Sequence, residues 1–171
     1  MNKTTMPADV VALDTSVPVW EQFFVVAPLV LIGTRDADGS LDLAPKHMVT
    51  PMGWQNYFGF VCSPRHGTCG NIDRTGVFTV SYPRPSQVLY ASLAASPRDD
   101  HGDKAILEHF RTFPAGEIDG EFIEDGYLFF ECRHFKTVDG FGENCLITGE
   151  IVAAWGDEHF LRHAEADDQE T

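Results

Sequence analysis

Residues that could bind an anion are concentrated in two short segments of the chain. The first, 44–50 (APKHMVT), ends a predicted strand and carries Lys46, His47 and Thr50 beside backbone amides that leave the strand. Donors of these types could hold a flat heterocycle and a phosphate. A solvated strand end has the same composition, so this segment alone does not decide between the two interpretations.

The second segment, 63–72 (SPRHGTCGNI), leaves another predicted strand and enters a helix. Arg65 and Thr68 then lie at a helix start, where unsatisfied amides and the helix dipole attract an anion. Ordinary capping of the helix by Ser63 or Thr68 is the alternative. If both segments flank one barrel mouth, we expect one phosphate-sized volume. Its lining would be Lys46, Thr50, Arg65 and Thr68.

The elements that must position these segments are mostly strands. Apolar runs bounded by turn residues predict strands at 28–34, 40–44, 57–62, 77–82, 127–138 and 145–155, with hairpin turns at Asp38-Gly39 and at 139–142. Helical stretches are predicted at 66–74, 87–95 and 103–110, and a loop at 114–120. This order predicts an antiparallel split β-barrel with inserted helices. We divide the chain into an N-terminal extension (1–19), one domain (20–156) and an acidic tail (157–171).

Charge and composition exclude several classes of function. The 171 residues include 12 Lys and Arg against 26 Asp and Glu, a net charge of −14, which would repel nucleic acid and anionic membranes. No apolar run is long enough to span a bilayer, and the first residues lack the apolar core of a secretory signal. We therefore expect a cytoplasmic protein whose four cysteines are reduced core thiols.

Other motifs give little support to competing chemistry. Cys62, His66 and Cys69 could supply three zinc ligands, but no fourth is close in sequence, so we expect no metal. His159 and His163 are spaced for one helix face beside the acidic tail and are interpreted as solvated. The sequence contains no GxSxG, GxxxxGK[ST] or GxGxxG motif.

The order of these motifs resembles that of a known family. The pattern APLVLIGT, DG, LAPKHMVTP, FGFVCSPRHGTCGNI, GVFTVSYP, FFEC and GFGENCLITGEIV is similar to the flavin reductase-like family of the FMN-binding split barrel, over about Trp20 to Trp155. The resemblance implies a homodimer that binds FMN at the subunit interface and reduces it with NADH or NADPH. Candidate interface residues are Trp20, Phe23, Phe24 and Trp155.

The resemblance also assigns residues to the site. It implies that Lys46, His47, Met48 and Thr50 border the flavin ring and ribityl chain, and that Arg65, His66, Thr68 and Asn71 hold the phosphate, with Cys62, Ser63 and Ser81 nearby. Lys46 or His47 would meet the negative charge that develops on the reduced ring.

One position departs from the family pattern. Many family members resemble Gly-Asp-His-Thr where this chain has Gly142-Glu143-Asn144-Cys145, and the histidine is the residue that would face the nicotinamide. Asn144 can donate a hydrogen bond but carries no proton to transfer. The sequence therefore predicts a flavin-dependent oxidoreductase, with Asn144 and His47 as candidate catalytic residues and a small acceptor or partner oxygenase downstream. A non-catalytic FMN-binding electron carrier is the alternative, and a flavin-free structural barrel is a third interpretation.

Overall fold

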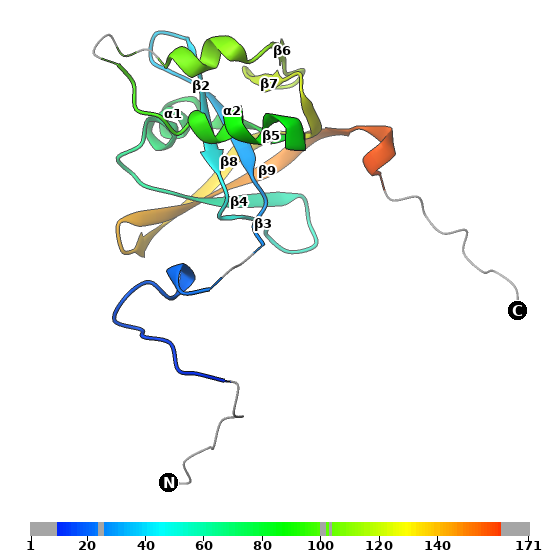
Figure 1. Ribbon diagram of the computed structural model, residues 1–171. Coiled ribbons are helices and arrows are strands. Elements are labelled where there is room, and N and C mark those ends of the chain that lie inside the picture. The colour runs from blue at the N-terminus through cyan, green and yellow to red at the C-terminus, as the bar shows by residue number, and fades with distance from the viewer. Residues whose placement is uncertain (1–9, 24–25, 100–101, 103, 162–171) are drawn as a thin grey trace, which may run out of the picture.

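The architecture is a curled, half-closed barrel built on one seven-stranded sheet, in the order β2-β1-β5-β8-β9-β4-β3 (Figure 1). The computed structural model describes residues 10–23, 26–99, 102 and 104–161. The neighbouring strands of the sheet are antiparallel. Its strands are β1 (Val30–Arg35), β2 (Leu41–Lys46), β3 (Val49–Pro51), β4 (Tyr57–Cys62), β5 (Val77–Pro83), β8 (Gly126–Phe141) and β9 (Asn144–Gly156).

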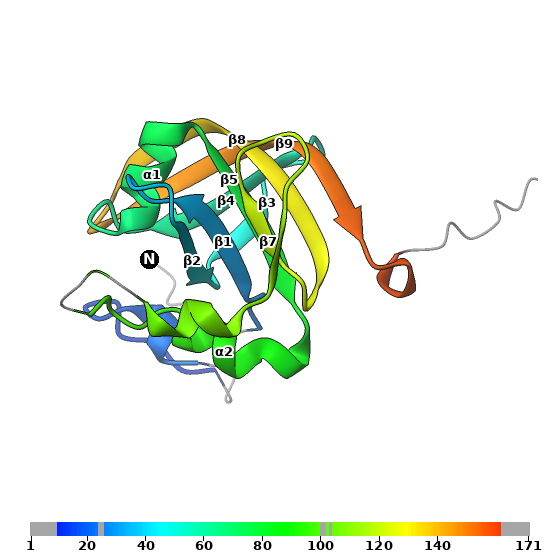
Figure 2. The same cartoon turned by 90° about the horizontal axis from the view of Figure 1, so that it is seen from above.

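Helices and a small second sheet are attached to this barrel (Figure 2). The α-helices are α1 (Gly67–Thr75) and α2 (Val88–Leu93), and the 3-10 helices are η1 (Val19–Glu21), η2 (Pro85–Gln87), η3 (Ala105–His109) and η4 (Glu158–Phe160). The second sheet pairs β6 (Thr112–Pro114) with β7 (Glu121–Ile123). Among the described residues, no helix has both the length and the hydropathy required to cross a membrane.

The β1–β2 hairpin carries the first site segment to the edge of the sheet. The two strands pair from Val30 opposite Lys46 to Arg35 opposite Leu41. Gly39 occupies the left-handed region at φ 86°, which glycine adopts without a side-chain clash, so the predicted turn is confirmed. Lys46 consequently lies at the end of β2, where the chain turns towards β3.

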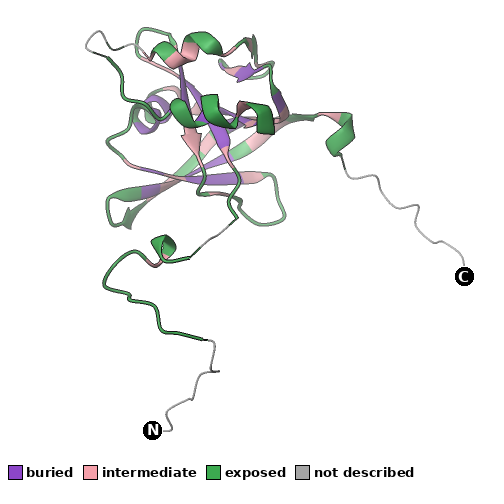
Figure 3. Ribbon diagram, in the orientation of Figure 1, coloured by how far each residue is buried: buried purple, intermediate pink, exposed green. Residues whose placement is uncertain are grey.

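β1 is buried on both faces, and this fixes the hairpin in place (Figure 3). Val30 and Ile32 point into the barrel and pack in a cluster with Phe60 and Phe78. Leu31 points the other way and packs with Ala91 of α2. The continuous apolar run of this strand follows from its two buried faces, since a strand with one solvated face alternates.

β8 and β9 form a long hairpin that connects β5 to β4. Register shifts along the pair bend the two strands. Cys145 near the start of β9 lies opposite Cys62 at the end of β4 in the register of these two antiparallel strands. All four cysteines are free and buried, which confirms the prediction of reduced core thiols.

A buried carboxylate anchors the loop between β6 and β7. Glu131 of β8 is fully buried, and its Oε1 accepts a hydrogen bond from the amide of Gly116 at 2.7 Å. Its Oε2 accepts from the amides of Glu117 and Ile118 at 2.7 and 2.8 Å. The hydroxyl of Thr79 donates to the carbonyl of Glu121 at 2.6 Å, so β5 and β8 both hold this region.

The short elements depart from the sequence-based expectation. β3, β6 and β7 are three residues each, too short for the sequence to show an alternating pattern. The helical stretch expected at 103–110 is a 3-10 helix over Ala105–His109, and α2 ends at Leu93 instead of Ala95. Residues 162–171 of the expected acidic tail lie outside the described residues.

Candidate anion-binding site

A cavity of about 530 Å³ lies where the end of β2, the first turn of α1 and the segment after α2 meet. One part of its lining is 44–46 with Asp42, a second is 65–68, and a third is 94–98 with Lys104. Four of the predicted site residues come together here. They are Lys46, Arg65, His66 and Thr68. The volume is of the size that small-molecule ligands occupy.

The first turn of α1 presents donors to this cavity. His66 is the N-cap residue and makes no side-chain capping bond, and the first turn contains no acidic residue. Neither Ser63 nor Thr68 caps the helix, although the Ser63 hydroxyl accepts from the amide of Arg65 at 3.3 Å just before it. Thr68 is 2% exposed, and its hydroxyl makes no hydrogen bond to another described residue. No fully buried side-chain oxygen or nitrogen of the described residues lacks a partner, so the unpartnered Thr68 hydroxyl keeps some accessible surface. The helix start therefore has free donors beside an accessible hydroxyl on a nearly buried threonine.

Two cations at the cavity have no carboxylate partner or only a weak one. Within the described part of the chain, Lys46 forms no ion pair. Arg65 pairs with Glu143 at 3.4 Å, but both side chains are about 80% exposed (80% and 79%). An exposed pair of this kind contributes about 0 to 1 kcal/mol, so it restrains Arg65 only weakly.

Two titratable neighbours respond to the cations of this cavity as well as to burial. The pKa of His66 is lowered because burial disfavours the charged ring and because Lys46 and Lys104 repel it. Burial raises the pKa of the Cys62 thiol, while the ammonium of Lys46 acts in the opposite direction. A chain with a net charge of −14 thus contains a cavity whose lining holds four Lys or Arg side chains and one carboxylate.

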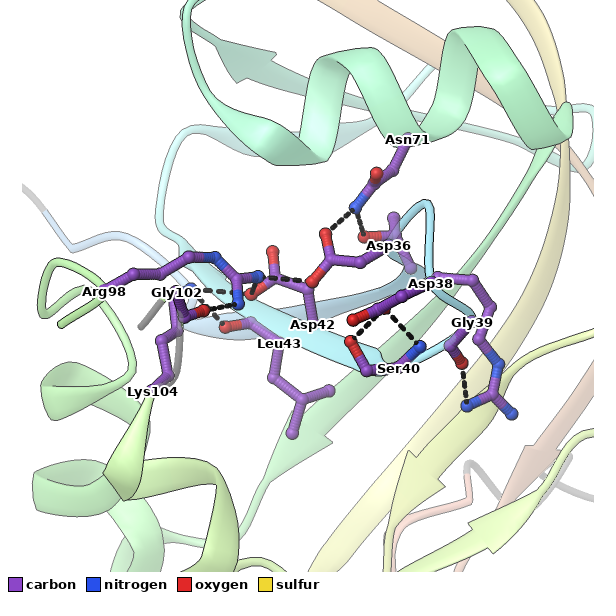
Figure 4. A network of polar contacts seen from close by, with 12 residues as sticks. Asp36, Asp38, Gly39, Ser40, Asp42, Leu43, Asn71, Arg98, Gly102 and Lys104 are labelled. Carbon is purple, nitrogen blue, oxygen red and sulfur yellow. Dashed lines mark hydrogen bonds and ion pairs between the residues drawn. The ribbon is translucent and has the colours of Figure 1, made fainter. Parts of the chain in front are cut away.

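Two further cations, Arg98 and Lys104, form a network with two carboxylates on the other wall (Figure 4). Lys104 Nζ donates to Asp42 Oδ1 at 2.7 Å and to the carbonyls of Leu43 and Ala94 at 3.3 Å each. Arg98 Nη2 lies 2.5 Å from Asp36 Oδ2 and 3.0 Å from Asp42 Oδ1. Lys104 uses all three of its donors, so it fixes the wall in place.

Sequence reasoning missed Arg98 and Lys104. They belong to a segment between α2 and η3 that had no predicted role, and ion pairs to β2 hold them at the cavity. One signal was available. Only 12 residues of the chain are Lys or Arg, and two of them bracket the acidic run at 98–104 (RDDHGDK).

Several predicted residues lie outside the cavity lining and have structural partners. Asn71 is buried, and its amide donates to Thr34 Oγ1 at 3.1 Å and to Asp36 Oδ1 at 2.8 Å. Ser81 is buried in β5 and accepts from the amide of Ile123 at 3.3 Å. Cys62 packs in the barrel core.

The remaining predicted residues lie at exposed positions. His47 and Met48 are exposed between β2 and β3, and Thr50 is exposed on β3, where its hydroxyl donates to the carbonyl of Pro51 at 3.2 Å. Asn144 is exposed at the turn between β8 and β9. The ion pair between its neighbour Glu143 and Arg65 connects that turn to the cavity mouth.

The zinc alternative has no geometric support. In residues 10–23, 26–99, 102 and 104–161, no three His, Cys, Asp or Glu side chains are arranged to hold a metal ion.

Comparison with protein families decides what kind of protein carries this site. The flavin reductase like domain matches residues 24–166. The chain belongs to this family. The resemblance inferred from the motif order, and the split-barrel fold expected from it, are therefore confirmed. A search of curated proteins finds no match.

Solved structures of flavin reductase-like proteins share the fold. A 2-nitrobenzoate 2-nitroreductase from Pseudomonas fluorescens is 21% identical, with a TM-score of 0.75 over 88% of this chain and 79% of that one. A flavoredoxin from Methanosarcina acetivorans is 23% identical, with a TM-score of 0.73 over 91% and 79%. Nitrilotriacetate monooxygenase component B from Bacillus cereus is 14% identical, with a TM-score of 0.76 over 91% and 86%.

Proposed function

We propose that this flavin reductase-like protein is an oxidoreductase that binds FMN, with the flavin phosphate in the cavity at the start of α1. The observation that carries the proposal is that Lys46, which has no carboxylate partner, and the weakly paired Arg65 line one cavity with the unpartnered hydroxyl of Thr68, in a chain of net charge −14. Such a concentration of donors suits a phosphate dianion.

The residues present fit this cofactor. Lys46, Arg65, Thr68 and the first amides of α1 would hold the phosphate, and His47, Met48 and Thr50 would border the ring and ribityl chain from the exposed segment that follows β2. When bound, FMN supplies the capacity to accept a hydride and pass electrons on. Lys46 and His47 would offer donors to the negative charge of the reduced ring.

The electron donor in this proposal is NADH or NADPH. We infer that Asn144 contacts it. Two observations support this role: the Glu143–Arg65 pair connects the turn of Asn144 to a residue of the cavity lining, and the Asn144 side chain is exposed. Its neutral amide would position the nicotinamide by hydrogen bonding and would transfer no proton.

The electron acceptor is a small molecule or a partner oxygenase. One structural relative is a monooxygenase component, and another is a nitroreductase. We also propose a cytoplasmic homodimer. Trp20, Phe23 and Trp155 are 63%, 43% and 47% exposed and could pack against a second copy, whereas Phe24 lies outside the described residues.

An electron carrier that never reacts with nicotinamide is the second candidate function. Asn144 in place of a histidine and the acidic surface favour it, because a negative surface would attract a basic redox partner. A flavoredoxin is among the structural relatives.

One pair of measurements tests the proposal. Anaerobic addition of NADH or NADPH to the FMN-loaded protein should bleach the flavin absorbance, and no bleaching with either donor would leave the carrier function. Arg65→Ala should weaken FMN binding by about tenfold and leave riboflavin binding unchanged, because it removes a charge-assisted bond to phosphate. The matched control is Arg111→Ala, since the Arg111 side chain is 76% exposed and, among the residues that the structure describes, its one ion pair is with Glu124. Equal losses for FMN and riboflavin would place the phosphate elsewhere.

A further inference from the structure

The Arg98 side chain is held differently from the other cation of its wall. Lys104 has three acceptors, and its side chain is 12% exposed. Arg98 is 34% exposed and lines the cavity, and its Nη2 bridges Asp36 and Asp42 (Figure 4). Its Nη1 donates to the exposed carbonyl of Gly102 at 2.7 Å.

Each carboxylate that Arg98 contacts has a second donor. Asp36 Oδ1 accepts from the amide of Asn71 at 2.8 Å, while Arg98 contacts Oδ2. Asp42 Oδ1 accepts from Lys104 at 2.7 Å as well as from Arg98 at 3.0 Å. If Arg98 leaves, Asp42 keeps the ammonium of Lys104, and Asp36, whose side chain is 21% exposed, keeps the amide of Asn71. Gly102 is an exposed residue, so water can replace Arg98 at its carbonyl.

A cation that can leave without isolating a buried charge is unusual, because breaking a buried ion pair ordinarily leaves an uncompensated charge at a high cost. Here the duplicate donors remove most of that cost. The network is therefore built so that Arg98 can exchange its carboxylate partners for another anion that enters the cavity it lines.

We propose that Arg98 is a transferable phosphate ligand, which releases Asp36 and binds the phosphate monoester of the flavin from the segment after α2, in the cavity that Lys46 and Arg65 also line. This inference rests on the proposed function, because it takes the anion to be the FMN phosphate. Asp36 is then a competitor of the ligand for Arg98, and Asn71 is the residue that holds Asp36 when Arg98 has moved.

If Asp36 competes with the ligand for Arg98, removing the charge of Asp36 should strengthen FMN binding. Asp36→Asn keeps a carbonyl oxygen for Asn71 but removes one of the two carboxylate charges that retain Arg98, while Asp42 keeps the other. FMN should therefore bind about threefold more tightly to this variant, since releasing a partly exposed ion pair no longer opposes binding. A purely structural role for Asp36 would weaken binding or leave it unchanged.

The test measures FMN and riboflavin affinity by fluorescence quenching for the wild type, Arg98→Ala, Arg98→Lys, Asp36→Asn, the double variant Arg98→Ala/Asp36→Asn, and the control Arg111→Ala. Arg98→Ala should raise the Kd for FMN about tenfold and change that for riboflavin less than about twofold. Arg98→Lys should lose less, because it keeps the charge but not the planar fork. The gain from Asp36→Asn should vanish in the double variant, because Arg98 mediates it.

Three results would overturn the inference. The first is a preference for FMN over riboflavin that is unchanged in Arg98→Ala, and the second is a loss of FMN affinity in Asp36→Asn. The third is a gain in FMN affinity from Asp36→Asn that persists in the double variant, because such a gain would reflect only the removal of a negative charge near the cavity. If Arg98→Ala does not fold, Arg98→Lys and Asp36→Asn still decide the question. If Arg65→Ala abolishes the preference for FMN over riboflavin and Arg98→Ala does not, the proposed function stands and this inference is refuted. A wild type with no FMN preference refutes both.

Discussion

Replacing Glu131 by glutamine should destabilise the protein far more than a surface Glu→Gln change does. The carboxylate accepts three backbone amides while fully buried, with Gly116 on one oxygen and Glu117 and Ile118 on the other. The amide oxygen of a glutamine can keep the latter pair. Its NH₂ group then faces the amide of Gly116, donor against donor.

The magnitude follows from these contacts. Losing one charge-assisted bond and opposing two donors should together cost about 3 kcal/mol, since each such loss is in the range of about 1 to 3 kcal/mol. At this chain length, about 1 kcal/mol shifts Tm by roughly 2 to 4 °C, so we expect a fall of roughly 6 to 12 °C.

Differential scanning calorimetry of Glu131→Gln beside Glu117→Gln measures the effect. Glu117 is the matched control because its exposed side chain makes no ion pair in the part of the chain that the structure describes. Equal Tm values for the two variants would refute the assignment of Glu131 as the anchor of this loop.

Two further predictions concern the cavity and its mouth. The pKa of His66 is lowered in the folded chain, so the unfolded chain takes up the proton first and the wild type loses stability as the pH falls. In paired urea titrations without ligand, His66→Gln should therefore gain stability relative to the wild type between about pH 7 and about pH 5. A stability difference that stays constant over this pH range would contradict this. Asn144→His should raise the anaerobic rate of flavin reduction by NADH or NADPH, by up to about a hundredfold if nicotinamide placement is the limiting factor. An unchanged slow rate would indicate a carrier, and a fast wild-type rate that Asn144→Ala leaves intact would remove Asn144 from the site.

The main strands of the fold and part of the site could be predicted from the sequence, because both depend on local patterns. The apolar run of β1 and the Asp38-Gly39 turn are sufficient to predict a hairpin, and the strand-to-helix change after Cys62 predicts donors at Arg65 and Thr68. Arg98 could not be found in this way, since its place at the cavity depends on ion pairs with carboxylates about sixty positions away (62 for Asp36).

Asn71 illustrates the opposite limitation. Its type and its position on the first turns of α1 suit a phosphate ligand, and the resemblance assigns it that role. In the structure, its amide donates to Thr34 and Asp36, because this face of α1 packs against the β1–β2 hairpin. A sequence shows that a donor is present but not which acceptor it binds. A direct contact of Asn71 with the phosphate stays a prediction. In the inference about Arg98, Asn71 acts indirectly, because it holds Asp36 when Arg98 has moved.

The two buried faces of β1 also bear on how this architecture can change over evolutionary time. A substitution in β1 disturbs the barrel interior on one side or the contact with α2 on the other, so the segment can vary only together with its neighbours. The cavity is lined by the end of β2, the first turn of α1 and the segment after α2, and its cations Lys46, Arg65 and Arg98 belong to neither apolar cluster. Substitutions among these cations can therefore change which ligand the cavity binds while the strands that hold Lys46 in position stay constant.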